Sequence, residues 1–274
     1  VAPALDPADG ARALALDKQY VFHSWSAQAA LQPLVVAGAA GCEVWDYDGT
    51  RWLDFSCQLV NTNIGHSHPR VVEAIQRQAA ELATVAPSTA NLARGEAAKR
   101  IVERAGEGFA KVFFTNGGAD AIENAIRMAR LTTGRDKVLS TYRSYHGNTG
   151  SAIVATGDWR RMPNEYATGH VHFFGPFLYR SEFHSETPEQ ETERALQHLR
   201  RTIQAEGPGT IAAILLESVP GTAGVLLPPP GYLEGVRALA DEYGIMWIAD
   251  EVMAGFGRTG DWFAFQHAGE LPEG

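Results

Sequence analysis

The chain has 274 residues, of which 45% are hydrophobic and 20% charged, and its formal net charge at pH 7 is −9. This is typical of a soluble globular protein with one large domain or a domain and a half. The acidic balance argues against a nucleic-acid partner, and no apolar run approaches the roughly 20 residues of a membrane span. Because the N-terminus shows no signal-peptide pattern, a cytoplasmic location is expected.

The first part of the chain predicts a small N-terminal domain. Residues 1–20 are rich in alanine, aspartate and proline and predict a loose arm. Residues 41–55 alternate around Asp48-Gly49, which is a strong signal for a tight β-hairpin turn. Residues 61–69 predict a loop, and Pro69 suits the first turn of a helix. We therefore place the N-terminal segment and the hairpin in a domain of residues 1–68.

Residues 69–274 alternate between helical and strand patterns and predict a second, larger domain. The spacing of apolar residues predicts helices over 92–101, 118–131, 187–201 and 232–243. Short apolar or β-branched runs predict strands over 111–115, 138–142, 211–216 and 245–249. Strands separated by helices imply βαβ units and therefore a mainly parallel sheet.

Acidic residues follow two of these expected strands. Asp250 comes directly after the run 245–249, and Glu217 after the run 211–216. Open α/β sheets bind their ligands at the carboxyl ends of the strands. A carboxylate there loses hydration and needs a cationic partner. The alternative for Glu217 is an exposed acid at the end of a strand.

A glycine-rich turn joins the expected strand 111–115 to the helix that follows it. Gly117 and Gly118 allow a close backbone approach, and the N–H groups that begin a helix, including that of Ala119, point at a bound anion. The turn is a candidate phosphate site; the alternative is a tight connection only.

A third polar segment follows the expected strand 138–142. Tyr145 could stack on a flat ring, because offset stacking of aromatic rings is favourable, or it could be a surface residue. His146 follows it. Another pair, His66 and His68, has no Cys/His cluster to accompany it, so the sequence predicts no metal site.

These motifs, in this order, resemble the class III (ω-) aminotransferases, from about Trp25 to the end of the chain. The strongest is the block 247–260, followed by Tyr145-His146-Gly147 and the Gly117-Gly118 turn. The resemblance implies a fold-type I transferase dependent on pyridoxal 5′-phosphate, with helices on both faces of the parallel sheet and the N-terminal part of a small α+β domain. It also implies a homodimer or homotetramer.

The resemblance implies a role for each candidate residue. Asp250 would keep the ring nitrogen protonated, and Glu217 would orient groups around the ring. The remaining cofactor-binding residues would be Gly117, Gly118, Ala119, Tyr145, His146, Val252 and Met253.

Two further positions bear on the cofactor oxygen and the substrate. Met253 stands where many relatives have a glutamine that binds the phenolic oxygen of the cofactor, and methionine cannot donate that bond. Trp25 resembles an aromatic residue of the substrate pocket, with a core tryptophan as the alternative.

The family's Schiff-base lysine follows the strand-end acid by a few tens of residues. The four lysines of this chain all precede Asp250: Lys18, Lys99, Lys111 and Lys137. The chain is therefore expected to be the first part of a longer enzyme, inactive alone, or the product of a gene that has lost its catalytic half.

The expected reaction is transamination between an amino donor, an ω-amino acid or amine, and a keto acid, pyruvate or 2-oxoglutarate. Alternatives are a decarboxylase or aminomutase of the same fold and a non-catalytic homologue.

Overall fold

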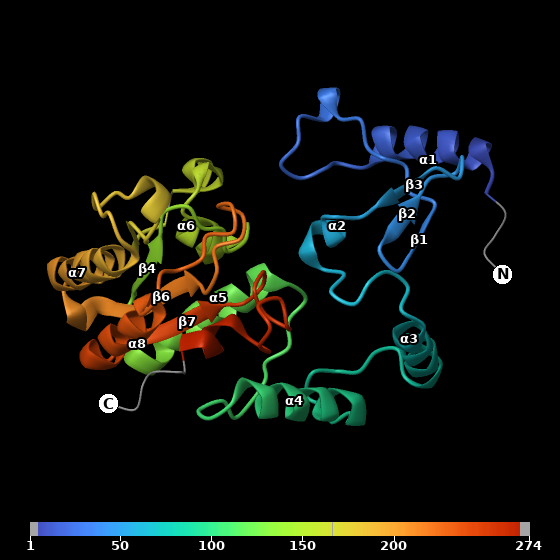
Figure 1. The fold of residues 1–274 in the computed structure, drawn as a ribbon. Helices are drawn as coiled ribbons and strands as arrows, with labels where there is room; N and C mark the ends of the chain where they lie inside the picture. Colours follow the sequence, from blue (N-terminus) through green and yellow to red (C-terminus); the bar gives the residue numbers. More distant parts are fainter. Residues whose placement is uncertain (1–4, 166, 269–274) are drawn as a thin grey trace. The chain divides into compact units, whose positions relative to one another are not determined.

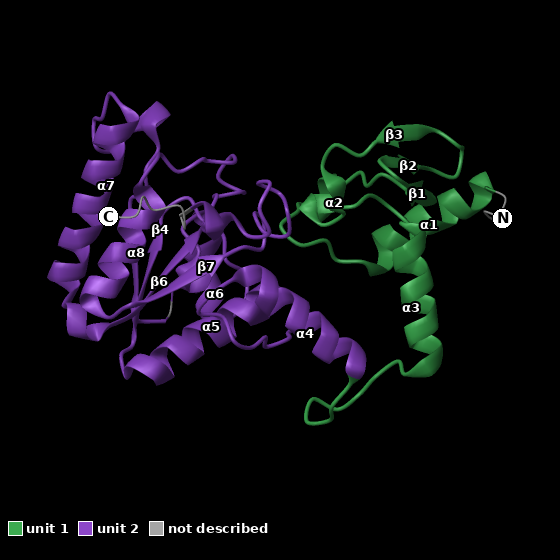
Figure 2. Cartoon of the chain, turned by 60° about the horizontal axis from the view of Figure 1, so that its bottom comes forward, with its two compact units in different colours: residues 1–91 green, residues 92–274 purple. Residues whose placement is uncertain are grey.

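The structure, a computed structural model, describes residues 5–165 and 167–268. The chain forms two compact units, residues 1–91 (unit 1) and residues 92–274 (unit 2), coloured separately in Figure 2. The domain boundary expected after residue 68 stays a prediction. No helix of the described residues has both the length and the apolar character needed to cross a bilayer.

Residues 7–20 form a helix where the sequence predicted a loose arm, so for them that prediction is wrong, and residues 1–4 lie outside the described residues. Helix α1 (Pro7–Tyr20) is capped by Asp6, whose side chain accepts a hydrogen bond from the backbone N–H of Ala8, and proline occupies its first turn. Aspartate at the N-cap and proline at the first helical position both favour a helix start. The short 3₁₀ helix η1 (Gln28–Ala30) follows.

The expected hairpin is confirmed as part of a three-stranded antiparallel sheet. Its strands are β1 (Gly38–Ala40), β2 (Glu43–Trp45) and β3 (Arg51–Leu53), in that spatial order. Gly49 has a φ of +83° in the turn between β2 and β3, a conformation that glycine adopts without steric cost.

A left-handed turn precedes the last helix of unit 1. All four residues of α2 (Cys57–Val60) have positive φ values, between 48° and 66°. The carboxylate of Asp54 accepts hydrogen bonds from the backbone and the side chain of Gln58, each at 3.1 Å. Helix α3 (Pro69–Glu81) then starts at the predicted proline.

Unit 2 is built on a four-stranded parallel sheet in the order β5-β4-β6-β7, as expected from the βαβ pattern (Figure 1). The strands are β4 (Lys137–Thr141), β5 (His170–Phe173), β6 (Ile211–Glu217) and β7 (Met246–Asp250). Every residue of β6 is buried. Such a continuously apolar strand is typical of a parallel sheet covered on both faces.

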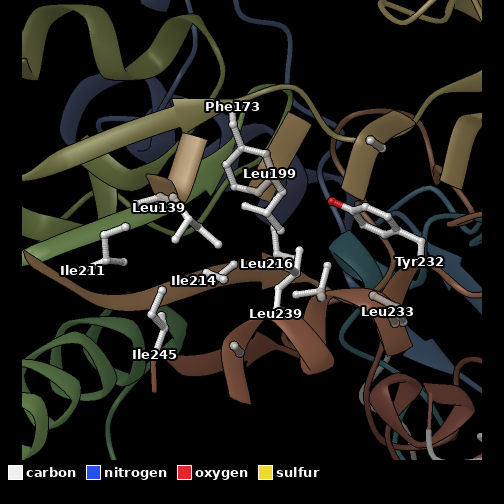
Figure 3. Close-up of a cluster of buried hydrophobic side chains, with 14 residues drawn as sticks. Leu139, Phe173, Leu199, Ile211, Ile214, Leu216, Tyr232, Leu233, Leu239 and Ile245 are labelled. Carbon is white, nitrogen blue, oxygen red and sulfur yellow. The ribbon is translucent and has the colours of Figure 1, made fainter. Parts of the chain in front are cut away.

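Helices cover both faces of this sheet. On one face α5 (Gly118–Thr133) and α6 (Gly150–Ala155) pack on Val138 and Leu215. On the other face α7 (Pro188–Glu206) and α8 (Tyr232–Tyr243) form the larger core cluster with Leu139 of β4 and with residues of β6 (Figure 3). The other helices of unit 2 are α4 (Leu92–Ala105), η2 (Trp159–Asn164), η3 (Leu178–Arg180), η4 (Pro208–Thr210) and η5 (Ala264–Ala268).

The strand predicted over residues 111–115 is absent, so this prediction is wrong. The segment has no regular secondary structure, and Phe113 and Phe114 are exposed. A β-branched and aromatic run becomes a strand only when a neighbour takes its backbone hydrogen bonds. Within the described residues, no strand pairs with this segment.

Candidate active site

Two buried acids lie side by side at the carboxyl end of the parallel sheet. Glu217 and Asp250 are the last residues of β6 and β7, and the register of the two strands pairs them directly. Their residues are only 6% and 4% exposed. The exposed strand-end acid that was the alternative for Glu217 is therefore not what the structure shows.

Asp250 has a histidine as its partner. Nδ1 of His146 lies 2.7 Å from Oδ2 of Asp250, and the backbone N–H of Val252 donates to Oδ1 at 3.1 Å. The backbone N–H of His146 donates to the hydroxyl of Thr156 at 3.0 Å, which fixes the loop that carries the ring. Nε2 of His146 is buried and has no hydrogen-bond partner among the described residues.

Glu217 joins two loops through its two carboxylate oxygens. Oε1 accepts a hydrogen bond from the backbone N–H of Tyr145 at 2.9 Å, and Oε2 accepts one from Gly221 at 2.8 Å. Burial raises the pKa of this carboxyl group, and the two N–H donors act in the opposite direction. Glu217 thus holds the backbone of Tyr145 next to the end of β6.

Glycines let the three motif segments approach one another closely. A Cβ atom added at Gly147 would lie 2.6 Å from Cβ of Ala119, and one added at Gly118 would lie 2.9 Å from Cγ2 of Val252. Real Cβ atoms do not come this close to other atoms, so a side chain at either position would push the segments apart. The structure therefore brings the Gly117–Ala119 turn, the Tyr145–Gly147 loop and the Asp250–Val252 segment together.

The first turn of α5 is open to an anion. Gly117 is its N-cap residue with extended backbone, and no side chain caps the helix. A Cβ atom added at Gly117 would meet nothing within 4 Å. Uncapped N–H groups at the start of a 16-residue helix, together with the helix dipole, favour a negatively charged group.

The remaining predicted site residues differ in their surroundings. Val252 is 63% exposed beside Gly118, whereas the side chain of Met253 packs against Gly221. Trp25 belongs to unit 1, where it is 46% exposed with a φ of +56°. A tryptophan this exposed is not a core residue of unit 1.

Several residues that shape the site were missed in the sequence. Glu251 accepts hydrogen bonds from the backbone N–H groups of Ala264 at 2.8 Å and Phe265 at 2.9 Å, and from the hydroxyl of Ser218. It therefore anchors the loop that follows Val252. Glu123 of α5 accepts hydrogen bonds from the hydroxyl of Thr149 and the backbone N–H of Ala152 at the start of α6.

Tyr145 has a cation against its ring. The guanidinium carbon of Arg160 lies 3.8 Å from the centre of the tyrosine ring, which is half-buried. No spacing rule connects these two positions, so a local sequence pattern could not predict the contact.

Comparisons with known proteins identify the family of this chain. The family model "Aminotransferase class-III" matches residues 25–273. Among curated relatives, the chain is 34% identical over 241 residues to an acetylornithine aminotransferase of Methanopyrus kandleri, covering 88% of this chain and 57% of that protein. It is 31% identical over 274 residues to a taurine–pyruvate aminotransferase of Bilophila wadsworthia, covering 97% and 59%. The chain thus spans somewhat less than three fifths of these relatives' length.

Solved structures show the same fold. The taurine:2-oxoglutarate aminotransferase from Bifidobacterium kashiwanohense, in complex with pyridoxal phosphate and glutamate, is 47% identical with a TM-score of 0.90, over 94% of this chain and 59% of that one. The ω-transaminase of Pseudomonas jessenii, in complex with pyridoxamine phosphate, is 31% identical with a TM-score of 0.87, over 92% and 59%. The expected fold-type I architecture is confirmed.

Proposed function

Because the chain belongs to the class III aminotransferase family, we propose that it is part of an enzyme that transfers an amino group from a donor to a keto acid with pyridoxal 5′-phosphate. The observation that carries the proposal is the buried carboxylate of Asp250 at the end of β7. It accepts hydrogen bonds from His146 and Val252 alone among the described residues. A carboxylate has about four lone-pair sites, so Asp250 can accept another bond from a ligand N–H.

The residues around Asp250 fit the cofactor. Asp250 would hold the ring nitrogen, with Tyr145 against one face of the ring and Val252 on the other. The N–H groups of Gly117, Gly118 and Ala119 would hold the phosphate, because no side chain of the described residues caps the start of α5 by a hydrogen bond. When bound, pyridoxal phosphate withdraws electrons from the substrate carbon that bears the amino group.

The protein's contribution is electrostatic and positional. Asp250 supplies a fixed negative charge that favours the protonated ring nitrogen, and His146 orients that carboxylate. Glu217 acts on the site by holding the backbone of Tyr145. Met253 offers no donor for the phenolic oxygen of the cofactor, so we propose that it contributes packing.

We propose an ω-amino acid or amine as the donor and 2-oxoglutarate or pyruvate as the acceptor. The supporting observation is the 47% identity to the taurine:2-oxoglutarate enzyme, the first of the solved structures above. Trp25 would then be the aromatic residue that contacts the donor.

We also propose a homodimer or homotetramer in the cytoplasm. Leu59, Ile64 and Ile75 of unit 1 are 86%, 64% and 63% exposed. Exposed apolar side chains of this kind indicate a contact with further protein. Sedimentation and cell fractionation would test the assembly and the location.

The experiment is a donor panel with the full-length protein. Taurine, β-alanine, simple amines and α-amino acids are each paired with pyruvate and with 2-oxoglutarate, and alanine or glutamate formation is measured. We expect turnover with at least one ω-amino donor. Release of carbon dioxide without a new amino acid would favour a decarboxylase. Cofactor binding without any reaction would favour a non-catalytic homologue.

A further inference from the structure

The contact between Arg160 and Tyr145 assigns a role to a residue outside the motifs. We propose that Arg160 is a positioning residue: its guanidinium covers one face of the Tyr145 ring and leaves the opposite face for the flat ring of the cofactor. The inference rests on the proposed function, because it concerns the same cofactor site.

The path of the backbone brings Arg160 to this place. A Cβ atom added at Gly157 would lie 2.0 Å from the carbonyl oxygen of Thr141, so only glycine allows the chain to cross the end of β4 here. The N–H of Gly157 donates to the carbonyl oxygen of Ser144 at 3.0 Å. The segment that begins at Gly157 is thereby fixed next to the loop of Tyr145.

Asp158 then fixes the plane of the guanidinium. Nε of Arg160 donates to Oδ2 of Asp158 at 2.9 Å, and Nη2 donates to the same oxygen. The backbone N–H of Arg160 donates to Oδ1 at 2.9 Å, which caps the helix η2. The two side chains are 17% and 22% exposed. A planar, forked cation held in this way can stack on an aromatic face, which an ammonium group cannot do.

The backbone contacts of the loop leave the orientation of the tyrosine ring to Arg160. Glu217 holds the N–H of Tyr145, and Thr156 holds that of His146. Neither bond sets the plane of the ring. The stacked guanidinium does, and because Asp158 balances its charge, the pair adds no net charge beside the Tyr145 ring.

A double-mutant cycle tests the role by ligand binding. Pyridoxamine 5′-phosphate and inorganic phosphate are the probes, titrated into the full-length wild type, Arg160→Met, Tyr145→Leu and the double variant. We expect Arg160→Met to weaken pyridoxamine phosphate about tenfold, within the range of a partly buried cation–π contact, and to leave phosphate binding unchanged. In the Tyr145→Leu background, the same change should have no further effect.

Two further variants serve as controls. Arg160→Lys keeps the charge and loses the planar face, so it should weaken pyridoxamine phosphate as Arg160→Met does, and it replaces that variant if Arg160→Met fails to fold. Arg180→Met removes a guanidinium that lies 5.7 Å from the ring of the exposed Tyr179, and it should change nothing.

The possible outcomes separate the two proposals. Equal binding of pyridoxamine phosphate and inorganic phosphate by the wild type would overturn the proposed function. A preference for pyridoxamine phosphate that Arg160→Met and Arg160→Lys leave unchanged would overturn the inference alone. Additive losses in the double variant would also overturn it, because Arg160 would then act independently of Tyr145.

Discussion

Each unit contains a largely buried carboxylate–histidine pair, and these two pairs have different surroundings. In unit 1, Nε2 of His66 lies 2.7 Å from Asp54; in unit 2, Nδ1 of His146 lies 2.7 Å from Asp250. Asp54 also accepts hydrogen bonds from the hydroxyl of Ser56 and from the backbone and side chain of Gln58. Asp250 accepts one more, from the backbone of Val252.

This difference separates a structural pair from a candidate ligand-binding pair. The hydrogen bonds to Asp54 are local and fix the left-handed turn of unit 1. Asp250 keeps hydrogen-bonding capacity at the end of a buried strand, where a buried charge needs a partner. Distance and burial alone would not distinguish the two; the number of local donors does.

The largest expected effect comes from removing the charge of Asp250. Asp250→Asn in the full-length protein keeps the shape of the side chain, and we expect turnover to fall at least about 100-fold, the scale of one preorganised electrostatic contact. Steady-state kinetics measure it. Asp54→Asn is the matched control and should leave turnover within a few-fold of wild type. Equal losses in the two variants would remove the distinction between the pairs.

A stability effect should follow from the close approach at Gly157. Gly157→Ala places a Cβ atom 2.0 Å from the carbonyl oxygen of Thr141, and we expect the free energy of unfolding of unit 2 to fall by about 1–3 kcal/mol or more. Urea denaturation measures it. In the control Gly117→Ala, the added Cβ atom has no described atom within 4 Å. We expect this variant to lower the free energy of unfolding by only a small fraction of the loss in Gly157→Ala. Unchanged stability in Gly157→Ala would show that the backbone at Gly157 can move away from Thr141 at little cost.

Acid should destabilise the two units in different pH windows. Burial, and then the charge of Arg130, lower the pKa of His170 from 6.5 to about 4, so the unfolded chain takes up the proton first and unit 2 loses stability as pH falls through this range. In unit 1, His66 is the largest cause that lowers the pKa of Asp54 from 3.8 to about 2. The ionised Asp54 therefore stabilises unit 1 above pH 3.8, and this stabilisation is lost as pH falls from 3.8 to about 2.

Melting temperatures measured from pH 7 to pH 2 would resolve the windows. His170→Gln should flatten the upper window and Asp54→Asn the lower one. If either variant flattened both, the two units would not respond to acid separately.

The smallest effect is expected at Met253, which gives the Asp250 region no side-chain donor. Met253→Gln adds an N–H group that can donate to the phenolic oxygen of the cofactor. We expect pyridoxamine phosphate to bind about threefold tighter, the scale of one neutral hydrogen bond. Calorimetric titration measures this, with Met253→Leu as the control of similar size. Weaker binding of the glutamine variant would mean that packing against Gly221 matters more.

The sequence predicted the parallel sheet because its strands and helices differ clearly in apolar spacing. It also brought out Glu217 and Asp250, since both end buried runs. The pairing of His146 with Asp250 was not predicted, because 104 residues separate them and only the fold brings them together.

Other features depend on contacts that a local pattern does not contain. Residues 111–115 have the composition of a strand and lack a paired neighbour among the described residues. Helix α1 carries start signals, Asp6 and Pro7, and alanines that favour a helix, and together these outweigh the proline and aspartate content that indicated a loose arm. Arg160 reaches Tyr145 only because Gly157 lets two backbones cross.

The left-handed turn of α2 has a consequence for protein engineering. Four non-glycine residues adopt this conformation, at a steric cost of about 1–2 kcal/mol each, and Asp54 offsets part of it through Gln58. A combinatorial library at Cys57, Leu59 and Val60 selected for heat tolerance should therefore become enriched in glycine and asparagine. Such substitutions would raise the thermal resistance of unit 1 without altering any residue of the proposed cofactor site in unit 2.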